Sequence, residues 1–187
     1  MAVKSKLAVA LAMVGVTALV PATASAEERV CNGTIGATTL DNVRVPQGGE
    51  CVLKRTHVQG TVKVERNATL RAKHVRVVGN VQGENARRVN VVKRSRVGGS
   101  VQVVQGHAAK VAKSKVVGQV LYDENSGFLK VLRNKVNGDV QAFKNSGGVR
   151  IASNVIDGNL QCKENTPSPT GGGNVVHGNK EDQCAAL

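Results

Sequence analysis

The chain contains 187 residues, of which 41% are hydrophobic but only 2% aromatic, and the sequence has no tryptophan. This composition excludes a core built around large rings, and it excludes binding surfaces that stack nucleobases on aromatic side chains. Lysine and arginine outnumber aspartate and glutamate by 26 to 13, and the resulting net charge of +13 favours anionic partners.

Residues 1–26 have the three parts of a secretory signal peptide. Lys4 and Lys6 precede an apolar stretch at residues 7–20, and the small residues Ala-Ser-Ala at 24–26 fit a cleavage site. The apolar stretch is too short to span a bilayer, and no later segment is apolar enough, so we expect no transmembrane segment. The sequence predicts a secreted, extracellular or envelope-associated protein. Loss of the two lysines lowers its net charge from +13 to +11.

After an irregular N-terminal cap, expected at residues 27–52, a glycine recurs every 19 or 20 residues. Valine or isoleucine stands two residues before each glycine, and an apolar residue usually stands two residues after it. A further apolar column lies seven residues before the glycines, comprising Leu53, Ala72, Val92, Val111, Val131 and Ile151. The repeated glycines are Gly60, Gly79, Gly99, Gly118, Gly138, Gly158 and Gly178.

This repeat predicts an all-β fold. The apolar alternation has a period of two, which is typical of strands, and about twenty residues are too few to bury a core alone. Stacking the units side by side buries a continuous column. We therefore expect a single-stranded parallel β-helix (solenoid) over residues 53–184, with about seven rungs of about 20 residues. A turn-rich insertion at 166–173 belongs to a C-terminal cap, and residues 185–187 form a tail.

Polar residues also recur at fixed positions. Four residues before the glycines stand Thr56, Val75, Ser95, Ser114, Asn134, Asn154 and Asn174, and a second series contains Asn125, Asn145 and Asn165. Amides stacked on successive coils can hydrogen-bond along the column. We assign these series a structural role inside the solenoid.

The four cysteines of an exported chain predict disulfides, and the repeat selects their pairing. Cys31 and Cys51 are 20 residues apart, and Cys162 and Cys184 are 22 apart, so each pair is separated by about one coil. Neighbouring coils lie within the Cα–Cα range of a disulfide, whereas the opposite ends of the stack do not. We predict Cys31–Cys51 and Cys162–Cys184, one at each end.

In rung length, valine columns and asparagine ladders, residues 53–180 resemble the right-handed parallel β-helix folds, a group that includes pectate lyases and bacterial polymer-forming solenoids. The segment 158–167, followed by 171–174, also resembles a segment of uncharacterised secreted bacterial proteins. The resemblance implies a right-handed coil and a bacterial origin, and it implies no activity.

Ten basic positions form two columns. The first lies five residues before the first five glycines, and the second lies three residues before them. In chain order the ten residues are Arg55, His57, His74, Arg76, Arg94, Arg96, Lys113, Lys115, Arg133 and Lys135. The positions two and four residues before each glycine are expected to point inward. Because side chains alternate along a strand, both basic columns are then expected to point outward on one strand face. We call these ten residues the basic stripe.

The stripe predicts binding of an anionic polymer. Like charges about 5 Å apart repel by roughly 0.8 kcal/mol per pair in water, so charges placed only for solubility would be interspersed with acids. Five coils extend over about 19 Å, enough for several anionic groups. The expected partner is an envelope or extracellular polysaccharide, a teichoic-acid-like polymer or nucleic acid, bound without enzymatic chemistry.

Two alternatives remain. A polysaccharide lyase or hydrolase would need paired carboxylates, but Glu65, Glu84 and Asp123 are interrupted by Val104 in their column. A passive structural or spacer protein would need no site at all. We assign no catalytic residue, no metal site and no small-molecule cofactor, and we expect a monomer because closed ends oppose polymerisation.

Overall fold

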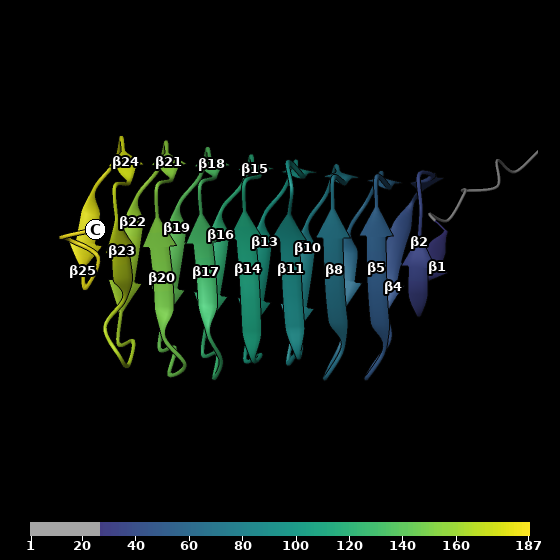
Figure 1. Ribbon diagram of the computed structural model, residues 1–187, viewed down its shortest axis with the longest axis horizontal. Coiled ribbons are helices and arrows are strands. Elements are labelled where there is room, and N and C mark those ends of the chain that lie inside the picture. The colour runs from purple at the N-terminus through teal and green to yellow at the C-terminus, as the bar shows by residue number, and fades with distance from the viewer. Residues whose placement is uncertain (1–26) are drawn as a thin grey trace, which may run out of the picture.

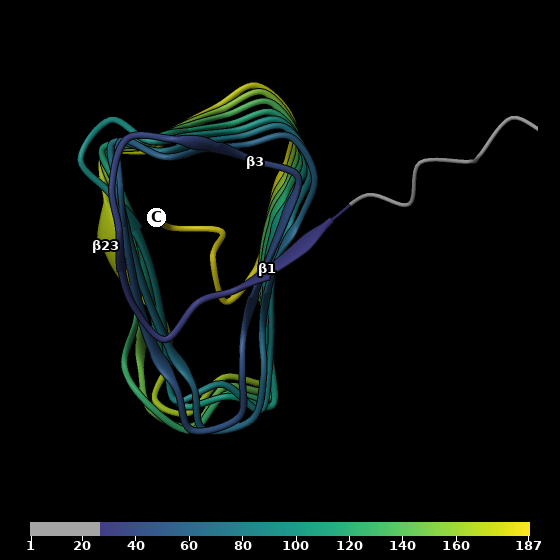
Figure 2. The same ribbon diagram turned by 90° about the vertical axis from the view of Figure 1, so that its right-hand side faces the viewer.

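The computed structural model describes residues 27–187, and the predicted signal peptide at 1–26 lies outside the described residues. Within this range all of the regular secondary structure consists of β-strands, and the strands of successive coils pair in parallel. The coils stack along the long axis of the molecule (Figure 1). Seen down that axis, they outline a three-sided cross-section (Figure 2). The fold is the predicted all-β parallel solenoid.

Each of the eight coils contributes one strand to each of three sheets, and β25 adds a ninth strand to one of them. Sheet A contains β1 (Glu28–Val30), β4 (Asn42–Val45), β7 (Val62–Val64), β10 (Val81–Glu84), β13 (Val101–Val104), β16 (Val120–Asp123), β19 (Val140–Phe143), β22 (Leu160–Lys163) and β25 (Lys180–Asp182). Sheet B contains β2 (Gly33–Ile35), β5 (Glu50–Lys54), β8 (Thr69–Lys73), β11 (Arg88–Val92), β14 (Ala108–Ala112), β17 (Leu129–Leu132), β20 (Val149–Ala152) and β23 (Thr170–Gly172). Sheet C contains β3 (Thr39–Leu40), β6 (His57–Val58), β9 (Arg76–Val77), β12 (Arg96–Val97), β15 (Lys115–Val116), β18 (Lys135–Val136), β21 (Val155–Ile156) and β24 (Val175–Val176).

The solenoid begins earlier than the repeat indicates. Residues 27–52, expected to be an irregular cap, contain β1 to β4, and β1, β2 and β3 pair in parallel with the next coil. The described residues therefore form eight coils rather than about seven. Asp41 occupies the glycine position of the first coil, since the Gly60 N–H donates to its carbonyl oxygen. The backbone ladder needs no particular side chain there, so the sequence pattern misses this coil.

Small branched side chains fill the interior. The column two residues before the repeated glycines is at most 1% exposed from Val58 to Ile156. Tyr122 is the one aromatic side chain of this core, and its hydroxyl donates to the Lys130 carbonyl oxygen at 3.2 Å. Burial raises the pKa of the Tyr122 hydroxyl.

The prediction that Val92 points inward is wrong. Val92 lies on the outer side of β11, and Val91 instead joins the buried column, in register with Ala72 and Val111. This coil has an extra corner residue, because both Lys93 and Arg94 adopt positive φ there. The position seven residues before Gly99 is therefore Val92, one residue after the buried Val91.

The corner between sheets B and C is a bend at a left-handed residue. The residue five before the glycine has φ between 51° and 67° in every coil from Arg55 to Gly173. The next residue then points inward, as Asn134, Asn154 and Asn174 do. A similar corner between sheets A and B has positive φ at Glu124, Lys144 and Glu164 and is followed by inward Asn125, Asn145 and Asn165.

The two asparagine ladders hydrogen-bond as predicted. Asn154 accepts from the backbone N–H and Nδ2 of Asn134 at 2.9 and 3.0 Å, and its own Nδ2 donates to Asn174 Oδ1 and the Val131 carbonyl oxygen. Asn145 makes the equivalent bonds in the second ladder. These amides satisfy corner backbone groups that a sharp bend would otherwise leave unpaired inside the protein.

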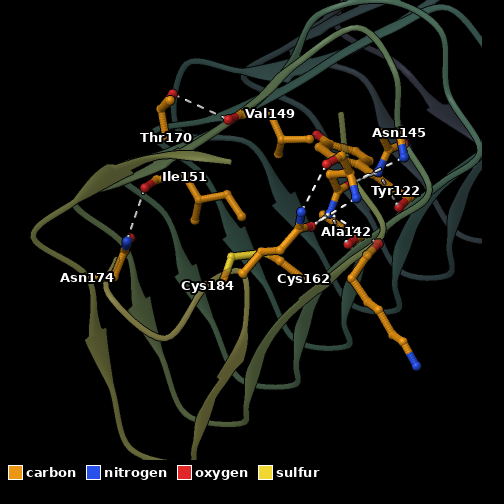
Figure 3. Close-up of a disulfide and its surroundings, with 12 residues drawn as sticks. Tyr122, Ala142, Asn145, Val149, Ile151, Cys162, Thr170, Asn174 and Cys184 are labelled. Carbon is orange, nitrogen blue, oxygen red and sulfur yellow. Dashed lines mark hydrogen bonds between the residues drawn. A yellow bond between two sulfur atoms is a disulfide. The ribbon is translucent and has the colours of Figure 1, made fainter. Parts of the chain in front are cut away.

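Both predicted disulfides are present, near the two ends of the stack. Cys31 and Cys51 have Cα atoms 5.5 Å apart, and Cys162 and Cys184 have Cα atoms 5.2 Å apart. Cys184 is fully buried beside Cys162 near Asn145 and Tyr122 (Figure 3). The C-terminal segment crosses the end of the interior (Figure 2), and Leu187 packs against the core.

The disulfides also bear on location. Two bonds of this kind indicate an oxidising, non-cytoplasmic compartment. In the part of the chain that the structure describes, no helix has the length and apolarity needed to cross a membrane.

Candidate polyanion-binding surface

The second column of the basic stripe is a continuous ladder on sheet C. His57, Arg76, Arg96, Lys115 and Lys135 are paired residue to residue across β6, β9, β12, β15 and β18. Arg76, Arg96 and Lys135 are exposed, and His57 and Lys115 are half-buried. Successive side chains are therefore about 4.8 Å apart at their Cα atoms, the spacing of neighbouring strands.

The first column lies at the left-handed corner rather than on the same strand face. Arg55, His74, Arg94, Lys113 and Arg133 all have positive φ and are all exposed. The expectation that both columns share one strand face is corrected by this bend. Because the corner directly precedes sheet C, the two columns still run side by side along the solenoid.

The backbone at this corner does not require a cationic side chain. A left-handed conformation disfavours any residue with a Cβ by roughly 1–2 kcal/mol, and glycine avoids this cost. Ser153 and Gly173 occupy the same corner in the last coils with the same sign of φ. The five cationic or histidine residues are thus a feature of the surface, and the fold accepts smaller residues in their place.

Most acidic residues lie away from the stripe. Among the strands of sheets B and C, only β5 carries one, Glu50. The other acids of the described strands lie in sheet A, and most of the rest lie at its two corners. Within residues 27–187 the only ion pair made by a stripe residue joins Lys135 Nζ to Asp157 Oδ2 at 3.9 Å. The molecule therefore has a basic side formed by sheets B and C and a mixed-charge side formed by sheet A.

The carboxylates considered for an enzyme lie on the sheet A side. Glu65 is bound to other groups, because it accepts from the Gln47 N–H at 3.0 Å and lies 3.6 Å from Arg44 Nη1. Arg44 also donates to Glu28 at 2.6 Å, and this hydrogen bond is the main cause of its raised pKa. These contacts tie the first coils together and do not isolate a pair of carboxylates.

Glu84 and Asp123 are on sheet A as well, separated by Val104 in the register, as the sequence indicates. No three His, Cys, Asp or Glu side chains in the described range converge in a way that could hold a metal ion. His177 Nδ1 lies 3.1 Å from Asp157 Oδ1 on the exposed surface.

Sequence reasoning misses a further group of cations on sheet B. Lys110, Lys130 and Arg150 are in register on the outer face of β14, β17 and β20. The signal is present in the sequence, since each stands eight residues before a repeated glycine. In the preceding coils the same register holds Asn90 and then Arg71, so a neutral residue interrupts the cations there.

Comparisons of the chain with protein-family models, with curated protein sequences and with solved structures find no match.

Proposed function

We propose that this protein is exported after removal of residues 1–26 and binds an anionic polymer of the envelope or the extracellular space through the basic stripe. The observation that carries the proposal is the in-register column of basic residues on sheet C beside a second, exposed column of basic residues at the corner. An extended polymer lying along the solenoid would meet a cationic pair at about every 4.8 Å.

The energetics favour a polymer over a small anion. Each neighbouring pair of like charges costs about 0.8 kcal/mol in water at this spacing, before screening. A bound polyanion relieves the repulsion of the whole column and releases its own condensed counterions, which makes affinity strongly salt-dependent. Arginine side chains can in addition form bidentate hydrogen bonds with carboxylate, sulfate or phosphate groups.

The two alternatives lack a comparable observation. A passive spacer protein has no use for a column of repelling charges, and a hydrolase or lyase has no pair of carboxylates on the basic side. Binding without catalysis is therefore the function that the surface supports best.

The test is elution from a heparin column as a function of salt. The variant Arg94→Gln, Arg96→Gln, Lys113→Gln, Lys115→Gln removes four stripe cations. Its control, Lys63→Gln, Arg66→Gln, Arg87→Gln, Lys163→Gln, removes two lysines and two arginines that are exposed and lie on sheet A or at its corner with sheet B.

Both variants lose the same net charge, so the comparison isolates position. We expect the stripe variant to elute at much lower salt than the control variant, with a shallower salt dependence of binding. Equal elution of the two variants would show that only net charge matters, and the stripe proposal would then be wrong.

A further inference from the structure

The outer face of sheet B carries a trough bounded by two rows of cations. One row is Lys110, Lys130 and Arg150, paired in register on the central strands that face the viewer in Figure 1. The other row is the corner pair Lys113 and Arg133, which belong to the basic stripe. The rows are three residues apart along each coil, or about 10 Å at most.

The floor between the rows is apolar. Ala112, Leu132 and Ala152 are in register on the outer side of the same three strands; Leu132 and Ala152 are half-buried, and Ala112 is 7% exposed. Together with the cations and Ser153 they line a hollow of about 310 Å³. This volume is at the lower end of the range for small-molecule pockets, about 300–1,000 Å³.

Phe128 also lines the hollow and stands two residues before Lys130 in the same coil. Lys130 Nζ lies over the ring, 4.8 Å from its centroid. The ring carbons also lie beside Gly148, where an added Cβ would meet them at 3.2 and 3.3 Å. Lys130 thus takes up one face of the ring by a cation–π contact, while Phe128 as a whole remains 46% exposed.

The five cations of the trough are free of acidic partners in the described range: each of the ion pairs found there involves other basic residues. An occupant must therefore supply negative charge on both of its edges. Because the floor is apolar, the middle of the occupant must be apolar as well. A flexible phosphodiester or polyphosphate chain meets the first requirement but gains nothing from the floor.

We infer that the trough is a binding site for an anionic glycan, in which a sugar ring lies on Ala112, Leu132 and Ala152 and its acidic substituents face the two cationic rows. The C–H groups of a pyranose ring form an apolar face, and carboxylate or sulfate groups lie at the ring edge. This inference rests on the proposed function, because the trough shares Lys113 and Arg133 with the stripe, and it names the class of polymer bound.

The experiment measures the affinity of the purified protein for three probes: a chondroitin sulfate oligosaccharide, an inorganic polyphosphate and a single-stranded DNA oligonucleotide. The floor variant is Leu132→Ser, and its control is Leu121→Ser, which removes a half-buried leucine from the outer face of sheet A. Losing about 40 Å² of apolar contact weakens glycan binding about five-fold. Polyphosphate and DNA affinity should stay unchanged.

The row variant is Lys110→Gln, Lys130→Gln, Arg150→Gln, and its control is Lys63→Gln, Lys163→Gln, Arg87→Gln. We expect the row variant to lower glycan affinity far more than its control and to reduce the salt slope by about 2–3, one for each cation removed.

The failure of this inference can be distinguished from the failure of the proposed function. If Leu132→Ser leaves glycan affinity unchanged, or weakens all three probes equally, the glycan assignment is wrong. If in addition Arg94→Gln, Arg96→Gln abolishes binding while the row variant matches its control, the stripe proposal stands and only the trough is rejected. Absence of binding to all three probes by the unaltered protein would overturn both.

Discussion

At the scale of single residues, the repeated glycines are required by space. They have no positive φ, but each lies against the preceding coil. A Cβ at Gly138 would meet the carbonyl carbon and oxygen of Gly118 at 2.9 Å and the Gln119 nitrogen at 3.1 Å. Because these are backbone atoms that hold the ladder, neither side can move without loosening the coil spacing.

Gly138→Ala should therefore lower the free energy of unfolding by about 1–3 kcal/mol, as overpacking a tight interior does. The control is Gly36→Ala, where an added Cβ meets nothing within 4 Å and the change should stay within about 0.5 kcal/mol of zero. Chemical denaturation measures both, and equal effects would refute the spatial explanation of the repeat.

At the scale of elements, the asparagine ladders hold the corners together. Replacing Asn154 by alanine leaves the Val131 carbonyl oxygen and the Asn134 backbone N–H without their partners inside the protein. Each unpaired buried group costs about 1–3 kcal/mol, so Asn154→Ala should destabilise the protein by at least about 2 kcal/mol. Asn137→Ala, at an exposed position, is the control and should have little effect. Similar losses in both would show that the ladder contributes no more than a surface amide.

The basic stripe has the opposite effect on stability. Its cations repel along the ladder, so Arg94→Gln, Arg96→Gln, Lys113→Gln, Lys115→Gln should stabilise the free protein by about 1 kcal/mol at low salt. The gain should disappear near 1 M salt, where the screening length is about 3 Å. Denaturation midpoints at the two salt concentrations measure this. Destabilisation at low salt would mean that the cations support the fold, which would remove the argument for a ligand.

At the scale of the whole molecule, the disulfides protect the two ends of the stack. Interior coils are held on both sides, whereas an end coil has one neighbour, so its opening is the lowest-energy fluctuation of a solenoid. Cys162→Ser, Cys184→Ser should cost about 2–4 kcal/mol, because the closed loop has about 20 residues. Amide exchange should accelerate first in β22 and β25. Uniform acceleration in all coils would contradict this account of the ends.

Much of this architecture is predictable from the sequence because a constant coil length converts sequence spacing into spatial neighbours. The glycine period correctly predicts the sheet C register, the asparagine ladders and both disulfides. The glycine repeat does not predict the first coil because Asp41 stands in the place of the glycine. The inward orientation predicted for Val92 is wrong because Lys93 is an extra corner residue. The trough is also missed, since its cations and apolar floor become one surface only when the sheet B face is folded.

The most direct test of the central claim keeps the net charge and changes only its position. In the variant Arg94→Gln, Arg96→Gln, Gln82→Arg, Gln102→Arg, two cations move from the stripe to the outer face of sheet A, where Gln82 and Gln102 are paired. The measured quantity is the salt concentration that elutes the protein from heparin. We predict elution at clearly lower salt than the unaltered protein, close to that of Arg94→Gln, Arg96→Gln alone. Elution at the same salt as the unaltered protein would contradict the claim that register creates the binding surface.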